Sequence, residues 1–254
     1  MFRINTGSSS YNVQSSASAE GAEGVKSYGL HDNLNVRANT TKVTDYVGTK
    51  AANQIPCLLS NATFQGDVIS VANSMAVLAA MGQGHGNVIV AGLDKAHLAG
   101  VQSVLAIAQS SGSQEAWLRE VKRQHKSGYA DHLELLIQRN QEHLSFDSLK
   151  QRLHRGGVSI VLADMASDSA TELARLAPHG VSGMYVSNIE MYLGGFLDKA
   201  NTSINERQQA LNTFKNNIVS LMGVEAFLIR GESVGMQVHN DKIAAIRDWI
   251  PQVR

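Results

Sequence analysis

The chain has one cysteine, no surplus of either charge and no long apolar run, and each of these features excludes a class of protein. The single Cys57 excludes an intramolecular disulfide framework. The 22 acidic and 22 basic residues balance, so no electrostatic footprint for nucleic acid or an anionic membrane is present. No apolar run approaches the roughly 18 residues that a membrane span needs, and the start of the chain lacks the features of a cleaved secretory signal. We therefore expect a soluble protein with neither a nucleic acid partner nor a membrane span.

The first 50 residues differ in composition from the rest of the chain. They are rich in Ser, Ala, Asn and Gly, and such a segment buries too little apolar surface to offset its ordering entropy. We expect a flexible leader over residues 1–50 and a folded domain over 51–254. A Ser-rich, uncleaved leader resembles the signals of type III secretion, which implies a bacterial cytoplasmic protein that is exported into a host cell. An ordinary flexible tail explains the same composition.

Short apolar runs alternate with helical periods from residue 55 onward. The pattern predicts strands at 67–72, 87–93, 158–164, 181–187, 224–231 and 234–240. It predicts helices at 74–81, 95–109, 167–177, 188–222 (with a break near 201–205) and 241–250. Residues 113–154 are helical without a strand and form an insertion. Alternating strands and helices indicate parallel strands joined by right-handed crossovers. The expected fold class is α/β, with a doubly wound, mostly parallel sheet.

The helical insertion contains four histidines at wide spacing. His125, His132, His143 and His154 would share a face only on one unbroken helix, and the pattern predicts breaks at Gly128 and before a capping box at Ser148–Gln151. Paired metal ligands on a helix stand closer together, commonly at i and i+4. A solvated polar face is the favoured interpretation, and we predict no metal site.

The glycine-rich stretch GQGHG, residues 82–86, invites a phosphate-binding interpretation. A phosphate-binding loop follows a strand and opens a helix, so that the helix amides face the anion. These glycines instead follow a predicted helix and precede a predicted strand. The pattern therefore indicates a helix C-cap and a turn.

Ligands of doubly wound sheets bind at the carboxyl ends of the strands, so the residues just after each strand are the candidates. Asn73 and Ser74 follow the first predicted strand, where each can cap the next helix or meet a ligand. Asp94 ends the second strand, at the position where an acidic side chain commonly binds ribose hydroxyls, and it can equally cap the helix that follows. Asp164 ends the third strand with the same two interpretations.

The fourth strand runs into the stretch Tyr185-Val-Ser-Asn-Ile-Glu190. Ser187 and Glu190 have the spacing of a capping box, which explains both by local structure. That interpretation leaves Asn188 and Tyr185 without a compulsory role, although Tyr185 could pack within the strand. We expect a cap that also presents Asn188 and Tyr185 to a pocket.

Residues 158–193, from VSIVLADMAS to VSNIEMYL, resemble a poorly characterised bacterial family with a methyltransferase-type Rossmann fold. The shared element is Y-x-S-N-x-E-x-Y-L, and a looser match extends over most of residues 60–230. The resemblance implies an S-adenosylmethionine pocket, with Asp94 at the ribose and Asp164 near the adenine. It places Met165 and Ser187 beside the cofactor together with Asn73 and Ser74, and Tyr185 and Asn188 at the catalytic strand end. The stretch VANSMA replaces the family's glycine-bearing first turn.

Two functions from different classes follow from these observations. The first is an S-adenosylmethionine-dependent methyltransferase, in which Asn188 and Tyr185 orient the methyl acceptor. The second is an exported effector that has lost catalysis and uses the fold as a nucleotide- or protein-binding module, with a host protein as its target. The glycine-free first turn and the Ser-rich leader motivate the second.

Overall fold

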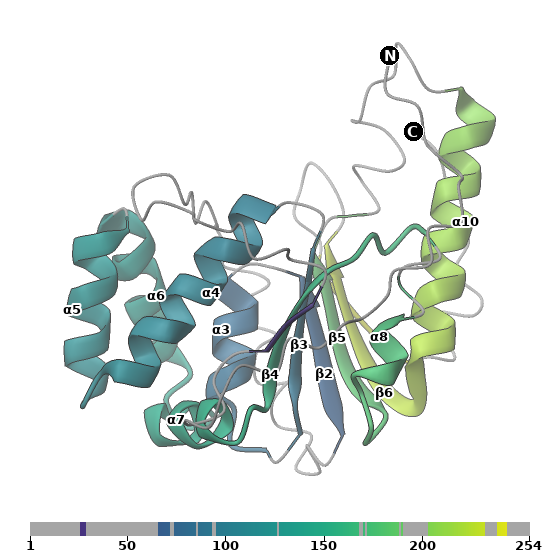
Figure 1. The fold of residues 1–254 in the computed structure, drawn as a ribbon. Coiled ribbons are helices and arrows are strands. Elements are labelled where there is room, and N and C mark those ends of the chain that lie inside the picture. Colours follow the sequence, from purple (N-terminus) through teal and green to yellow (C-terminus); the bar gives the residue numbers. More distant parts are fainter. Residues whose placement is uncertain are drawn as a thin grey trace.

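The computed structural model contains a seven-stranded sheet with helices on both faces (Figure 1). Six strands are parallel and one, β7, runs antiparallel to its neighbour β6. The fold is therefore α/β with a Rossmann-like, doubly wound and mostly parallel sheet, as the sequence predicts. The structure describes residues 26–28, 66–71, 74–84, 86–92, 95–125, 127–167, 170, 172–187, 189, 203–231 and 238–242.

The order of the strands reverses between β2 and β5. The sheet runs β1-β4-β3-β2-β5-β6-β7, so the chain builds outward from β2 in one direction and then returns to build from β5 in the other. The strands are β1 (Lys26–Tyr28), β2 (Asp67–Val71), β3 (Val88–Gly92), β4 (Val158–Leu162), β5 (Val181–Ser187), β6 (Met222–Gly231) and β7 (Val238–Lys242). Such a reversal creates a crevice at the carboxyl ends of the two strands that flank it.

Two apolar clusters, one on each face, hold the helices to the sheet. One face carries α3 (Ser74–Met81), α4 (Lys95–Ser110) and α7 (Phe146–His154), and the other carries α8 (Glu172–Arg175) and α10 (Ile204–Leu221) (Figure 1). Successive side chains of a strand alternate between the two clusters, as Val68 and Ile69 do. Every residue of α3 is buried, because this helix packs between the sheet and the helices α4 and α7.

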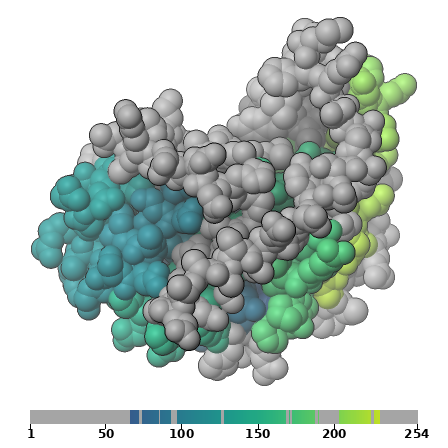
Figure 2. Space-filling view, viewed as in Figure 1, coloured from purple at the N-terminus to yellow at the C-terminus, as the bar shows by residue number. Residues whose placement is uncertain are grey.

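The helical insertion forms an outer layer beyond α4. Its helices α5 (Gln114–Gln124) and α6 (Ser127–Arg139) pack on each other and build one side of the molecule (Figure 2). The break between them lies at 125–126, so the prediction of a break at Gly128 is off by one turn. The N-cap of α7 is Ser145, whose Oγ accepts from Ser148 N at 3.3 Å, and not Ser148 as predicted. Ser148 is instead the third residue of the helix.

The C-terminal part of the chain differs from the prediction in one respect. The strand predicted at 234–240 is observed as β7, which extends to Lys242, so Asp241 and Lys242 belong to a strand and not to a helix. Pairing with β6 decides this, because backbone partners across a sheet are invisible to local periodicity. The described residues contain no helix that is long and apolar enough to cross a membrane.

A short strand from the predicted leader covers one edge of the sheet. β1 pairs in parallel with residues 159–161 of β4, which would otherwise be an edge strand of five mostly apolar residues. An exposed edge of this composition is a template for association with another chain. The leader therefore contributes a cover to the sheet edge, which its composition does not predict.

Truncation of the leader at two points tests this cover. Deleting residues 2–20 leaves β1 in place, and we expect an unchanged melting temperature and a monomer. Deleting residues 2–50 removes about three backbone hydrogen bonds, each with a net contribution of about 1 kcal/mol, so we expect a domain that folds but melts about 6–12 °C lower and self-associates. Calorimetry and sedimentation velocity measure both effects. Equal melting temperatures and an equal oligomeric state of the two truncated proteins would show that β1 does not protect the edge of β4.

Candidate functional site

The candidate site lies at the carboxyl ends of β2 and β5, where the strand order reverses. β2 ends at Val71 and α3 begins at Ser74, so the connection between them has only two residues. β3 ends at Gly92 and α4 begins at Lys95, again after two residues. Both helices therefore open directly from the sheet edge, with their N-terminal amides close to the strand ends. This geometry suits an anionic or hydroxyl-bearing ligand.

Three hydroxyl side chains are buried around this reversal. Ser70 and Tyr185 are register partners on adjacent strands, and both side chains lie on the face that carries α3. Ser70 Oγ donates to Val71 O at 3.0 Å, and Ser74 is fully buried at the first position of α3. The predictions included Tyr185 and Ser74 but missed Ser70, because a serine in mid-strand carries no signal of its own in the sequence.

Asp164 lies on a tightly bonded loop after β4. Its Oδ1 accepts from Ala166 N at 2.8 Å, while Ser167 donates to Asp164 O through N at 3.1 Å and Oγ at 3.2 Å. The residue is partly buried, and its carboxylate accepts a backbone hydrogen bond within the turn. Met165 is buried in the apolar cluster under α8 and α10.

The remaining predicted ligand residues fall between or at the ends of described segments. Asn73, Asp94 and Asn188 lie outside the described residues, and so does Glu190 of the predicted capping box. Ser187 is the last residue of β5, and its side chain is outside the described set. The structure therefore brings together the strand ends that carry these residues: β2, β3 and β5 are consecutive or adjacent in the sheet.

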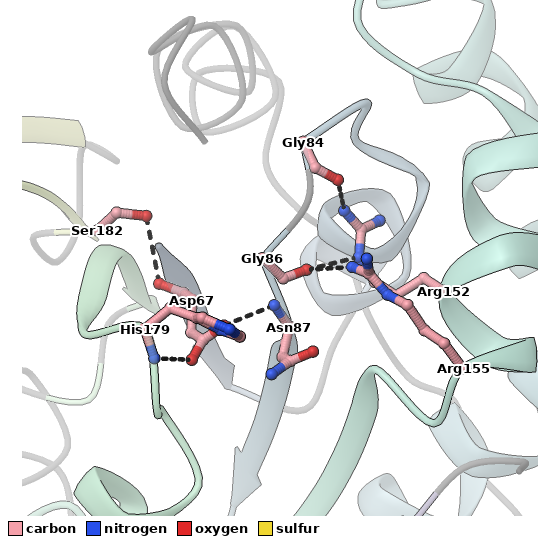
Figure 3. A network of polar contacts seen from close by, with 8 residues as sticks. All are labelled: Asp67, Gly84, Gly86, Asn87, Arg152, Arg155, His179 and Ser182. Atoms are coloured by element: carbon pink, nitrogen blue, oxygen red, sulfur yellow. Dashed lines mark hydrogen bonds and ion pairs between the residues drawn. The ribbon is translucent and has the colours of Figure 1, made fainter. Parts of the chain in front are cut away.

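A different polar network, at the opposite end of the strands, is centred on the buried carboxylate of Asp67 (Figure 3). Its Oδ1 accepts from Asn87 N at 2.7 Å and contacts His179 Nδ1 at 3.1 Å, and its Oδ2 accepts from His179 N at 3.2 Å. The contacts join β2 to the segments that precede β3 and β5. Asp67 thus aligns the amino ends of three strands.

The GQGHG stretch lies at this same end, wrapped around the guanidinium of Arg152 from α7 (Figure 3). Arg152 donates through Nε to Gly86 O at 2.9 Å, and through its two terminal nitrogens to the carbonyls of Gly82 at 2.9 Å, Gly84 at 2.5 Å and Ala80. Burial, and secondarily the charge of Arg155, lowers the pKa of Arg152 to about 10, so the group stays protonated at neutral pH. The carbonyls of the stretch face a cation, which confirms that it is a turn and not a phosphate cradle.

Gly86 is required by a close approach of two chain segments. A Cβ on this residue would stand 1.8 Å from Gly66 O, the backbone that leads into β2. Its own carbonyl accepts from both Arg152 and Arg155. The absence of a side chain at Gly86 therefore allows the two backbone segments to pack closely at the amino ends of the strands.

His125 departs from the expected solvated histidine face. It is 8% exposed at the end of α5, with Nε2 3.1 Å from Ser103 Oγ on α4 and its ring beside Tyr129 of α6. Nδ1 has no hydrogen-bond partner among the described residues, and burial lowers the pKa of the imidazole. His125 therefore packs as a neutral side chain that joins three helices. The described residues contain no group of three or more His, Cys, Asp or Glu side chains placed to hold a metal ion.

No protein-family model matches the chain, and a search of curated proteins finds no match either.

Proposed function

We propose that the protein is an S-adenosylmethionine-dependent methyltransferase whose cofactor lies across the carboxyl ends of β2, β3, β4 and β5. The order of the sheet is the observation that carries this proposal. The strands reverse between β2 and β5, and the last strand, β7, is antiparallel to β6. Ligands of doubly wound sheets bind in the crevice at such a reversal, and an antiparallel edge strand is common on these sheets.

The groups at the strand ends fit the chemistry of this cofactor. The N-terminal amides of α3 suit the carboxylate of its amino acid part. Asp94, in the connection between β3 and α4, would accept from the ribose hydroxyls, and Asp164 with the neighbouring Met165 would lie near the adenine. Asn73 and Ser74 would border the amino acid part, and Ser187 would close the pocket at the end of β5.

When bound, S-adenosylmethionine supplies an electrophilic methyl group, and the protein's part is to orient the acceptor. Tyr185 lies near the end of β5, beside the reversal of strand order, and Asn188 directly follows β5 in the sequence. We assign them to the acceptor as orienting hydrogen-bonding groups. The buried Ser70 next to Tyr185 would support the tyrosine in this position.

Substitution of Asp94 tests the cofactor site. Asn caps a helix about as well as Asp, so Asp94→Asn should leave the melting temperature of the free protein unchanged. Charge-assisted hydrogen bonds are roughly twice as strong as neutral ones, so the affinity for S-adenosylmethionine should fall by about tenfold or more. Thermal denaturation without ligand measures the melting temperature. Calorimetric titration and the ligand-induced thermal shift measure the affinity. Equal thermal shifts in parent and variant would make Asp94 a cap only, and a parent silent at millimolar ligand would exclude the function.

One observation favours a second candidate function, a catalytically inactive binding module of an exported effector. The connection between β2 and α3 has two residues and neither is a glycine, so the backbone there has less freedom to approach a ligand. In that case a host protein should bind the chain, and Asn188→Ala should leave the association intact. Loss of the association in this variant would count against the binding module.

A further inference from the structure

A side chain from α10 holds the loop that carries Asp164. Asn217 Nδ2 donates to Met165 O at 3.0 Å and to Ser167 O at 2.8 Å, across about 50 residues of sequence. The amide nitrogen of asparagine has two hydrogens, and both are directed at this loop. The contact therefore constrains the loop at two points, one on each side of residue 166.

The loop is also fixed at its start. Ala163 N donates to Gly92 O at 3.0 Å, which joins the end of β4 to the end of β3. Asp164 then bonds within the turn, through Oδ1 to Ala166 N and through its carbonyl to Ser167. Asn217 supplies the side-chain hydrogen bonds that tie this turn to α10, beside the apolar packing of Met165. A change at Asn217 would thus loosen the turn without touching the strand.

Asn217 differs from the apolar residues through which α10 packs on the sheet. The helix packs on the sheet mainly through apolar side chains such as Phe214, Ile218 and Leu221, whose burial stabilises the contact without the directionality of a hydrogen bond. A pair of hydrogen bonds to two carbonyls specifies a single arrangement of the loop. Directional control is needed where a loop positions a ligand, at the carboxyl edge of the sheet.

We propose that Asn217 is a positioning residue of the cofactor site: it holds the carbonyls of Met165 and Ser167 so that Asp164 keeps the orientation in which it meets the adenine end of the ligand. This inference rests on the proposed methyltransferase function, and it adds a residue that lies 50 positions from Ser167 in the sequence. Asn217 acts through the loop and does not itself contact the cofactor.

The test compares Asn217→Asp with Asn216→Asp in the full chain. Asp has the shape of Asn but no donors, so it sets a carboxylate oxygen against two carbonyl oxygens. Asn216 is an exposed asparagine on the same helix and receives the same charge change. We expect the affinity for S-adenosylhomocysteine, measured by calorimetry, to fall at least tenfold in Asn217→Asp and to stay within twofold in Asn216→Asp. Should Asn217→Asp not fold, Asn217→Ala removes the donors without adding a charge.

A double-mutant cycle in ligand affinity separates positioning from general damage. If Asn217 acts through Asp164, then adding Asn217→Asp to Asp164→Asn should cost no more than a further twofold in affinity. A further tenfold loss in that background, or an unchanged affinity of the single variant, would overturn the proposal.

Hydrogen exchange at Ala166 and Ser167 supplies a readout that needs no ligand. Both amides bond within the turn, so exchange should quicken in Asn217→Asp and not in Asn216→Asp. A parent protein that binds no adenosyl ligand refutes the methyltransferase function and with it the cofactor role of Asn217. Faster exchange in Asn217→Asp would in that case still show that Asn217 holds the loop. Unchanged exchange would refute this structural role as well.

Discussion

Replacing Arg152 with Met should lower the free energy of unfolding by about 3–4 kcal/mol, because four backbone carbonyls lose a buried donor. The carbonyls belong to residues 80, 82, 84 and 86, and they converge on a guanidinium that is 1% exposed. Met preserves the length and apolar stem of the side chain, so the change isolates the hydrogen bonds. Urea unfolding followed by circular dichroism measures the loss.

Arg155→Met is the matched control for this experiment. Arg155 is exposed and shares only Gly86 O with Arg152, through a bond of 3.1 Å. We expect a loss below about 1 kcal/mol in the control. Arg152→Lys should fall between the two variants, because an ammonium group cannot reach four carbonyls in fork geometry. Equal losses for Arg152→Met and Arg155→Met would mean that the turn folds without the buried cation.

Replacing Asp67 with Asn should cost about 2–3 kcal/mol, the second largest effect we expect. The carboxylate accepts from two backbone amides, those of Asn87 and His179, one on each oxygen. Asn offers one acceptor and turns its amide hydrogens toward the other N–H, so one buried donor is left unpaired. Chemical denaturation measures the loss, and the ligand affinity per folded molecule should not change, because Asp67 lies at the opposite ends of the strands from the candidate site.

His179→Gln separates the imidazole contact of Asp67 from its backbone contacts. The imidazole is 55% exposed on its side chain, so solvent screens its interaction with Asp67. The variant should therefore lose less than half of what Asp67→Asn loses. Asp131→Asn, at an exposed contact with Lys122, should leave the melting temperature unchanged. A larger loss in His179→Gln than in Asp67→Asn would place the stabilisation in the imidazole contact.

The polar networks around Arg152 and Asp67 stabilise the amino ends of the strands, whereas the candidate ligand site lies at their carboxyl ends. Arg152 and Asp67 fix the segments that enter β2, β3 and β5, while the connections that leave β2 and β3 are only two residues long. Substitutions at the amino ends should therefore change stability, and substitutions at the carboxyl ends should change ligand binding. This separation makes the stability and affinity measurements independent of each other.

The sequence by itself determined the fold class and most of the elements. Short strands of five mostly apolar residues leave a nearly continuous apolar signal, and α4 shows an apolar stripe at helical spacing, whereas α3 is apolar on all sides. The position of GQGHG, after a predicted helix and before a predicted strand, was also sufficient to exclude a phosphate-binding loop. In each case the evidence is local, because strand, helix and turn chemistry are set by residues close in the chain.

Only the tertiary structure decided which polar side chains act together. Asp67 meets His179 across 112 residues, Arg152 meets Gly86 across 66, and Asn217 meets Ser167 across 50. No periodicity links such pairs, so the sequence showed an ordinary Asp, Arg and Asn. The same reason explains the pairing of β1 with β4, the burial of His125 and the extension of β7 to Lys242. Contacts between distant segments are set by how layers pack, and packing is a property of the whole chain.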